Sequence, residues 1–184
     1  EAGGTPVTSV TLDFEGDTRN ATTPDIGADE FIGTPLDLVA PTISYTAIIN
    51  TSNTTSVSLT ANITDVSGID TAANSPRLYM KKGALGIYSN VNATTVVGSD
   101  YNFTFNYSLI GGVAVGDTVH YYVAAQDFYS NAGTSPSGGS GSNPPGTTPP
   151  ATAAQYLIVN LPLSGSYTVG LAMFNKISGR DISF

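Results

Sequence analysis

Apolar and polar residues alternate with a period of two in several stretches of this chain. Between residues 57 and 64 every second position is apolar, and the positions between carry only hydroxyl or amide side chains. The apolar set is Val57, Leu59, Ala61 and Ile63, and the polar set is Ser58, Thr60, Asn62 and Thr64. Because successive side chains of a β-strand point to opposite faces, this pattern predicts a strand with one face in a core and the other in water.

The same alternation recurs along the middle of the chain. Aromatic residues occupy every second position from 101 to 107, and apolar residues do so from 119 to 125. Turns that contain glycine separate these stretches,. The predicted strands span residues 42–49, 55–64, 77–82, 86–91, 100–109, 117–127 and 155–161. About seven short strands joined by turns predict an all-β fold, a sandwich of two sheets.

The chain divides into three parts. Residues 1–40 form an acidic N-terminal extension, residues 41–161 form the sandwich, and residues 162–184 form a C-terminal strand extension. Within the sandwich, residues 134–153 are rich in Gly, Ser and Pro. A strand that the sandwich needs follows this segment, so we expect a long loop inside one domain rather than a linker between two.

The acidic extension holds one further strand pattern. Val10, Leu12 and Phe14 alternate with Thr11 and Asp13,. A short strand by itself is unstable in water, so we expect it to pair with the following domain, with another adjacent domain or with a neighbouring molecule. The C-terminal extension ends on a similar alternating pattern and needs a partner for the same reason. Both ends of the chain are therefore predicted to make contacts with neighbours.

Composition narrows the chemistry that the chain can perform. Charged residues make up only 11% of the 184 residues, and Thr, Ser and Asn supply most of the polarity,. The chain has no Cys and a single His, His120, which excludes disulfides and thiol chemistry and leaves little for acid–base catalysis,. The net charge of −8 disfavours nucleic acid and anionic membranes as partners,. No stretch reaches the roughly 18 apolar residues of a membrane span. We expect a protein that is not an enzyme and does not insert into membranes.

Two pairs of motifs resemble parts of large secreted bacterial surface proteins. Residues 25–31, DIGADEF, preceded by residues 13–19, DFEGDTR, resemble the closing segment of a right-handed parallel β-helix domain. Residues 77–82, RLYMKK, and residues 116–127, GDTVHYYVAAQD, are similar to strands of the Ig-like domain that follows such helices. The resemblance implies an Ig-like or fibronectin-III-like β-sandwich in an extracellular, cell-surface protein without catalytic activity. Because the β-helix itself is absent, we expect a piece processed or excised from a longer protein.

Asp13, Glu15 and Asp17 are the candidate metal ligands in the sequence. They are carboxylates at alternate positions around a glycine-containing turn, and hard oxygen ligands of this kind suit Ca²⁺,. Their spacing differs from that of an EF-hand, and a solvated acidic surface accounts for the same residues. Calcium is the only cofactor that we consider, and both interpretations stay open.

Asn-X-Ser/Thr sequons are frequent in the chain. There are seven, whereas composition alone would give roughly three by chance. The asparagines are Asn20, Asn50, Asn53, Asn62, Asn92, Asn102 and Asn106. They are candidate sites for glycans, although a chain rich in Asn and Thr also creates sequons that carry none.

Two functions of different classes fit these features. In the first, copies of the chain join head-to-tail into filaments, because one end donates a strand to the open sheet edge of a neighbour. In the second, the chain is a spacer or a carbohydrate-binding and adhesion module of a larger surface protein or enzyme. Tyrosines that stack on sugar rings would then form a platform, unless they pack in the core. These tyrosines are Tyr79, Tyr88, Tyr121 and Tyr122.

Overall fold

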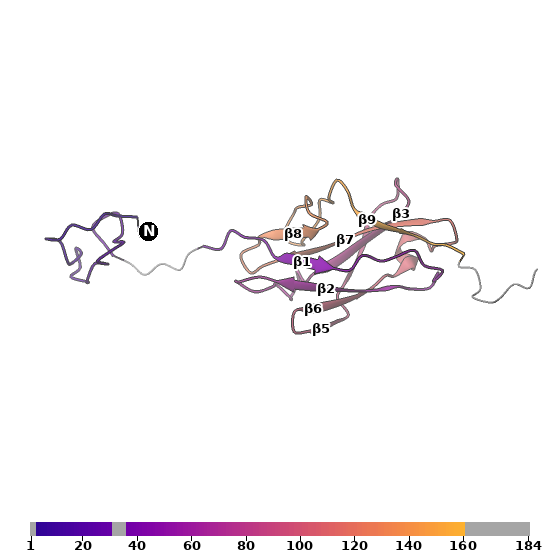
Figure 1. The fold of residues 1–184 in the computed structure, drawn as a ribbon, viewed down its shortest axis with the longest axis horizontal. Coiled ribbons are helices and arrows are strands. Elements are labelled where there is room, and N and C mark those ends of the chain that lie inside the picture. Colours follow the sequence, from indigo (N-terminus) through magenta and orange to yellow (C-terminus); the bar gives the residue numbers. More distant parts are fainter. Residues whose placement is uncertain (1–2, 31–35, 161–184) are drawn as a thin grey trace, which may run out of the picture.

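The computed structural model describes residues 3–30 and 36–160. All strands and the single short helix of this described part lie between residues 42 and 157. The strands are β1 (Thr42–Tyr45), β2 (Ser58–Thr64), β3 (Arg77–Lys82), β4 (Ser89–Asn92), β5 (Thr95–Val97), β6 (Asp100–Thr104), β7 (Thr118–Gln126), β8 (Ala132–Ser135) and β9 (Ala154–Leu157). A 3₁₀-helix, η1, spans Tyr107–Ile110. Figure 1 shows these elements along the chain.

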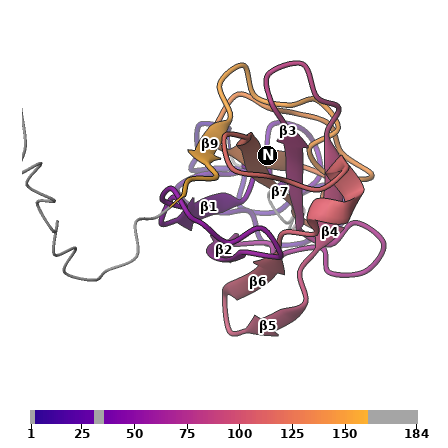
Figure 2. The same cartoon turned by 90° about the vertical axis from the view of Figure 1, so that its right-hand side faces the viewer.

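The strands form two antiparallel sheets that make a β-sandwich, and Figure 2 shows the two layers from the end. One sheet has the order β1-β2-β6-β5. The other has the order β4-β3-β7-β8, with β9 also paired to β7. The predicted all-β sandwich of two sheets is confirmed, with nine strands in place of about seven.

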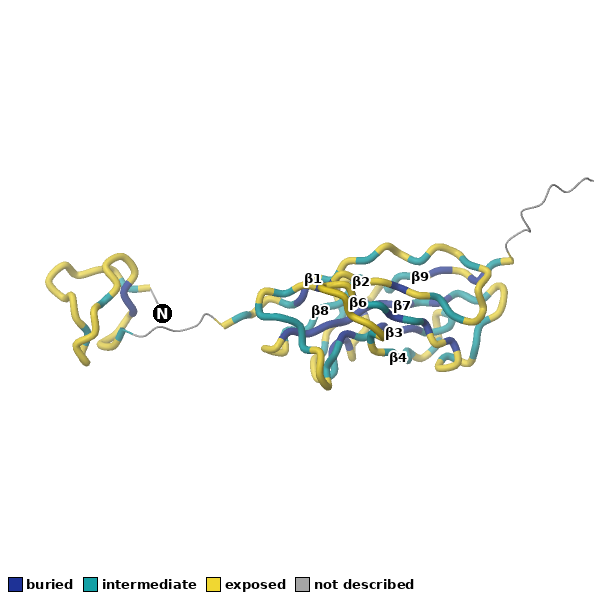
Figure 3. The backbone as a smooth tube through the Cα atoms, turned by 90° about the horizontal axis from the view of Figure 1, so that it is seen from below, coloured by how far each residue is buried: buried dark blue, intermediate teal, exposed yellow. Residues whose placement is uncertain are grey.

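The core lies between the two sheets. Along β2, Leu59, Ala61 and Ile63 are buried and the residues between them are exposed, as the alternation predicted. Aromatic side chains fill the centre, where the Phe105 ring meets the rings of Tyr121 and Tyr156 edge-on, with centroids 5.3 and 5.6 Å apart. Figure 3 shows buried residues running along β3 and β7. Burial of this apolar face is the main force that holds the sheets together.

The Gly/Ser/Pro-rich segment covers the outer face of the second sheet. It lies between β8 and β9, which pair with the two halves of the same strand, β7. Two tyrosine hydroxyls of the sheet donate to its backbone carbonyls, Tyr79 to Pro145 and Tyr122 to Gly146, both at 2.8 Å. These polar contacts explain why both faces of β7 are buried, although the alternation predicted burial of only one.

The loop packs so closely that Gly146 has no room for a side chain. A Cβ atom at this position would lie 2.3 Å from the Cβ of Ala124, and the residue has a φ of +78°. Gly138 in the same loop also has a positive φ, +99°, but open space around it. Both positions favour glycine for their backbone conformation, and only Gly146 also depends on close packing.

We expect Gly146→Ala to destabilise the sandwich by roughly 1–3 kcal/mol more than Gly138→Ala, because both variants strain the backbone and only the first forces atoms together. Urea unfolding of the two variants, followed by circular dichroism, measures the difference. Equal stabilities would show that the loop does not pack on β7 in solution.

Several strand ends differ from the prediction. The strand expected over residues 100–109 ends at Thr104, because Asn106 caps η1 by accepting a hydrogen bond from the Ser108 N–H. The strand expected over residues 42–49 ends at Tyr45. β5 and β8 were not predicted. Buried and exposed residues do not alternate in either strand, since β5 is exposed throughout and β8 is half-buried throughout. The C-terminal extension, residues 162–184, lies outside the described residues.

The strand predicted over Val10, Leu12 and Phe14 is not formed within residues 3–30. Leu12 makes one isolated bridge with Thr18. The chain turns because the carboxylate of Asp13 accepts hydrogen bonds from the backbone N–H groups of the turn that follows it, at 2.7 and 3.0 Å. Short-range polar contacts of this kind compete with an extended conformation.

Polar contacts also organise the rest of residues 3–30. The guanidinium of Arg19 donates to the carbonyls of Gly27 and Asp25, at 2.9 and 2.6 Å, and lies 3.5 Å from the carboxylate of Glu30. Glu30 in turn accepts the backbone N–H groups of Asn20 and Asp25. Within this described segment only Pro24 and Asp25 are buried, so it has no apolar core of its own.

Candidate functional site

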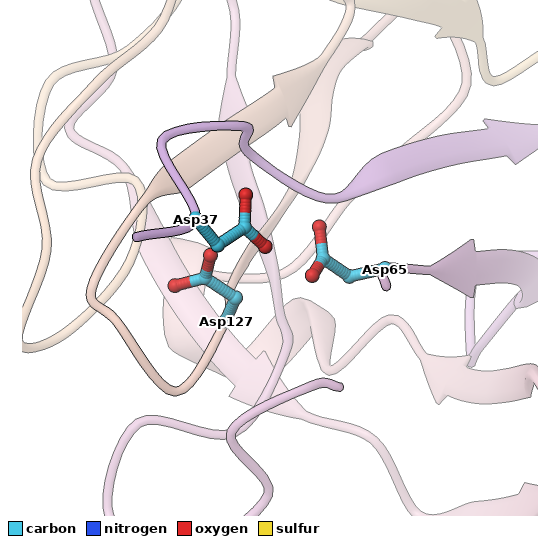
Figure 4. Close-up of side chains that lie close together, drawn as sticks. All are labelled: Asp37, Asp65 and Asp127. Carbon is cyan, nitrogen blue, oxygen red and sulfur yellow. The ribbon is translucent and has the colours of Figure 1, made fainter. Parts of the chain in front are cut away.

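Three aspartates meet at one end of the sandwich. Asp37 precedes β1, Asp65 directly follows β2, and Asp127 directly follows β7. Each offers one carboxylate oxygen, and these oxygens all lie within 4.8 Å of one another. Figure 4 shows the carboxylates of Asp37 and Asp65 pointing toward each other, with Asp127 beside Asp37. We call this group the aspartate cluster.

The sheet register explains why residues so distant in sequence come together. In the antiparallel pair of β1 and β2, Thr42 lies opposite Thr64. The start of β1 and the end of β2 therefore lie at the same end of the sandwich, which brings Asp65 near the segment that contains Asp37. β7, in the other sheet, finishes at the same end of the sandwich. A β-bridge between Ile69 and Asp127 joins the end of β7 to the loop after β2.

Asp127 is the buried member of the aspartate cluster, with 0% of its surface exposed. Its Oδ1 accepts the backbone N–H groups of Tyr129 and Asn131, both at 2.8 Å, and its Oδ2 accepts the Asn131 side-chain amide at 2.6 Å. The same amide donates to the backbone carbonyl of Asp37 at 2.9 Å. Asn131 thus holds the backbone of Asp37 and the carboxylate of Asp127 together.

Asp65 and Asp37 are each oriented by their own loop. Asp65 Oδ1 accepts both the backbone N–H and the hydroxyl of Ser67, at 2.8 and 2.7 Å. Asp37 Oδ1 accepts the backbone N–H of Val39 at 2.8 Å, and this hydrogen bond is the main reason why the pKa of Asp37 lies below its ordinary value. The other oxygen of Asp37, Oδ2, is buried and has no hydrogen-bond partner in the described part of the chain.

No cation neutralises the aspartate cluster within residues 3–30 and 36–160. The two ion pairs found there join Arg19 to Glu30 and Lys82 to Asp117, away from the cluster. Three carboxylates converge without a basic side chain, and this all-oxygen set suits a hard divalent cation.

The ligands predicted from sequence are arranged differently. Asp13 uses both of its carboxylate oxygens to accept backbone N–H groups, including that of Glu30 at 3.0 Å, and these bonds lower its pKa, the one from Glu30 most. In the described chain, Asp13, Glu15 and Asp17 do not belong to any group of three carboxylates with oxygens within 4.8 Å. Asp13 organises its own turn, and calcium binding by Asp13, Glu15 and Asp17 stays a prediction.

The sequon asparagines lie mostly at the surface. Asn20, Asn50, Asn53, Asn62, Asn92 and Asn106 are exposed, and Asn102 is half-buried. Asn62 and Asn102 occupy the outward face of the first sheet, where the Asn62 amide donates to Asp100 and Asn102 accepts the hydroxyl of Thr60. Glycosylation of these residues stays a prediction.

The predicted tyrosine platform is not an open surface. Tyr121 lies in the core, and Tyr79 and Tyr122 stack on each other at 4.7 Å beneath the loop between β8 and β9. Tyr88 packs edge-on against Tyr122 and is half-buried. His120 lies opposite Lys81 in the pairing of β3 with β7, and its pKa is lowered by burial and by the charge of Lys81.

The aspartate cluster was missed in the sequence because its members lie in three separate parts of the chain. Two signals were present: Asp65 comes immediately after a predicted strand, and Asp127 is the last residue of another. The sheet topology decides which strands finish at the same end of the sandwich. Asp37, which stands in the acidic extension, carries no such signal.

None of the described helices is long and apolar enough to cross a membrane. No family model matches the chain, and no curated protein matches it either. What the protein does must therefore be inferred from its own residues and their geometry.

Proposed function

We propose that this chain is a non-enzymatic structural protein of the extracellular space or cell surface, which assembles head-to-tail with copies of itself. The N-terminal segment of one copy contacts the sandwich of the next. A contact between two different surfaces repeats from copy to copy and produces a filament unless the rotation closes a ring.

The observation that carries this proposal is the exposed apolar surface of residues 3–30. Phe14 is 87% exposed and Ile26 is 80% exposed. Val7, Val10 and Leu12 are each about half exposed. A segment held together by polar contacts cannot cover these side chains itself, so they favour contact with another surface.

The sandwich offers an edge that such a segment could join. β5 is the last strand of the first sheet, and all three of its residues are exposed, including Val96 and Val97. An edge strand has unpaired backbone groups that accept an added strand. Val10, Leu12 and Phe14 would then extend on docking, and the few contacts that they make within their own segment keep the cost of this rearrangement small.

A spacer role in a larger surface protein is the second candidate. The chain enters the sandwich near β1 and leaves it beyond β9 at the opposite end, as Figure 1 shows, which suits a module placed in line between others. Carbohydrate binding has less support, because the loop between β8 and β9 covers Tyr79 and Tyr122.

Deletion of residues 1–20 should abolish self-assembly, because it removes most of the exposed apolar side chains of the N-terminal segment. Electron microscopy and light scattering of the full chain and of the truncated chain measure the result. A milder variant replaces Val10, Leu12 and Phe14 with Ser and should have the same effect.

The matched control replaces three apolar residues of the sandwich loops that are at least as exposed, Val66, Leu85 and Ile87, with Ser. This variant should assemble as the unaltered chain does. Filaments formed by the truncated chain would refute the proposal, and a full chain that stays monomeric would favour the spacer role.

A further inference from the structure

We propose that the aspartate cluster of Asp37, Asp65 and Asp127 binds one Ca²⁺ ion, which fastens the segment before β1 to the end of the sandwich. This site is distinct from the acidic turn at Asp13, Glu15 and Asp17. It is also independent of self-assembly, which the proposed function assigns to residues 3–30.

The first reason is the unpartnered oxygen of Asp37. Oδ2 has an exposed area below 1 Å² and no hydrogen-bond partner among the described residues, while the Asp37 carboxylate points toward that of Asp65 (Figure 4). A carboxylate oxygen that has lost its water without gaining a donor is costly. A cation among the three carboxylates supplies the missing partner.

The second reason is the charge of the site. Three carboxylates come within 4.8 Å of one another, and one of them, Asp127, is fully buried. Neither ion pair of the described chain involves them. Like charges this close repel each other, most strongly at the buried Asp127,, and a divalent ion would balance most of this charge.

The third reason is the fit of distances. Calcium–oxygen bonds are about 2.4 Å long, so two ligands on opposite sides of one ion are about 4.8 Å apart. The separations in the aspartate cluster stay within that limit, which is compatible with a single ion that contacts one oxygen of each residue. Water molecules would complete the coordination.

The ligand chemistry favours Ca²⁺ over other metals. Zn²⁺ sites in proteins are built mainly from Cys and His, and neither contributes to this cluster. Mg²⁺ demands near-ideal octahedral geometry and gives up its water reluctantly, whereas Ca²⁺ accepts irregular sets of six to eight oxygens. Three ligands from three different loops form an irregular set.

The surrounding hydrogen bonds prepare the site. Ser67 orients Asp65, and Asn131 orients Asp127 while also holding the backbone of Asp37. Such outer contacts are typical of metal sites, because they fix the ligands before the ion arrives. Bound Ca²⁺ would link the segment before β1 directly to the ends of β2 and β7, and so restrict the motion of that segment.

Isothermal titration of the full chain with CaCl₂, after removal of metal by a chelator, tests the proposal. We expect one ion per chain with a Kd between about 10 µM and 1 mM, and a melting temperature higher by several degrees in 10 mM CaCl₂. MgCl₂ at the same ionic strength should have a clearly smaller effect. Absence of binding at 10 mM CaCl₂ would overturn the proposal.

Variants locate the ion. Asp37→Asn should weaken Ca²⁺ binding at least tenfold, and because Asp37 lies outside the sheets this variant should still fold. Asp65→Asn is the second test from another loop. Asp17→Asn removes a charge from the other acidic turn and should leave Ca²⁺ affinity unchanged. If Asp17→Asn abolished binding while Asp37→Asn did not, the ion would belong to the acidic turn and the proposal would be wrong.

Limited proteolysis provides a readout other than affinity. Cleavage between residues 36 and 41 should slow at least severalfold in CaCl₂ for the unaltered chain and not for Asp37→Asn. Equal cleavage rates with and without CaCl₂, in a chain that binds the ion, would contradict the fastening role.

Discussion

Raising the pH above 10 should unfold the sandwich cooperatively, because six tyrosines are buried in it. They are Tyr79, Tyr101, Tyr107, Tyr121, Tyr122 and Tyr156. Burial raises the pKa of each of them above the ordinary value of 10. The protonated form is therefore favoured in the folded state, while the unfolded chain loses these protons from pH 10 upward.

The sign of the effect follows from that difference. The folded state binds more protons than the unfolded state above pH 10, so the free energy of unfolding falls as the pH rises. Below pH 10 both states are protonated and this contribution to stability is fully present. At pH 11 each tyrosine that stays protonated in the folded state costs about 1.4 kcal/mol, so that several such tyrosines remove a large share of the stability of a typical domain.

Absorbance of tyrosinate at 295 nm and far-ultraviolet circular dichroism, recorded between pH 8 and 12, measure this transition. Most of the tyrosinate signal should appear together with the loss of sheet structure. Tyr156→Phe removes one of these ionisable groups and should shift the transition to higher pH. The variant also removes the 2.8 Å hydrogen bond between the hydroxyls of Tyr156 and Tyr107, so its stability at neutral pH is measured as well. Full tyrosine titration with the sheets intact would contradict the packing described above.

Phe105→Ala should destabilise the sandwich by about 3–5 kcal/mol, because it removes the ring at the centre of the aromatic core and leaves a cavity. Phe105 is fully buried and contacts the rings of Tyr107, Tyr121 and Tyr156. The contacts with Tyr121 and Tyr156 are edge-to-face, an arrangement that adds to the energy of burial alone,. Urea unfolding of the variant and of the unaltered chain gives the difference.

Phe128→Ala is the matched control, since the same atoms are removed from a ring that is 67% exposed. Its cost should stay below about 1 kcal/mol, as is usual for surface positions. A similar loss for both variants would show that Phe105 does not occupy the core.

Much of the fold could be predicted from the local sequence pattern. In β2 and β6, strict alternation identified both the strand and the residues that face the core, because the period of two in the sequence matches the period of the side chains,. The limits of the strands were less predictable. Asn106 caps η1 and so ends the extended backbone before Tyr107, the last of the alternating aromatics, and such local hydrogen bonds are not visible in a hydrophobic pattern.

The N-terminal segment shows the limit of the same reasoning. Val10, Leu12 and Phe14 alternate as β2 does, yet they form no strand within the described chain. An alternating pattern specifies a strand only where a partner supplies hydrogen bonds and a core, and here the carboxylate of Asp13 turns the chain back instead. Whether a neighbour draws the segment into a sheet is what the truncation experiment decides.

By itself, then, the sequence determined the all-β class and the buried face of the central strands, because both depend on neighbours within a few residues. Only the tertiary structure decided that the Gly/Ser/Pro-rich loop buries Tyr79 and Tyr122 and that Asp37, Asp65 and Asp127 meet at one edge. These contacts depend on which strands pair and where each strand ends. Residues far apart in the chain come together through those pairings, and no local pattern of hydrophobic and polar positions records them.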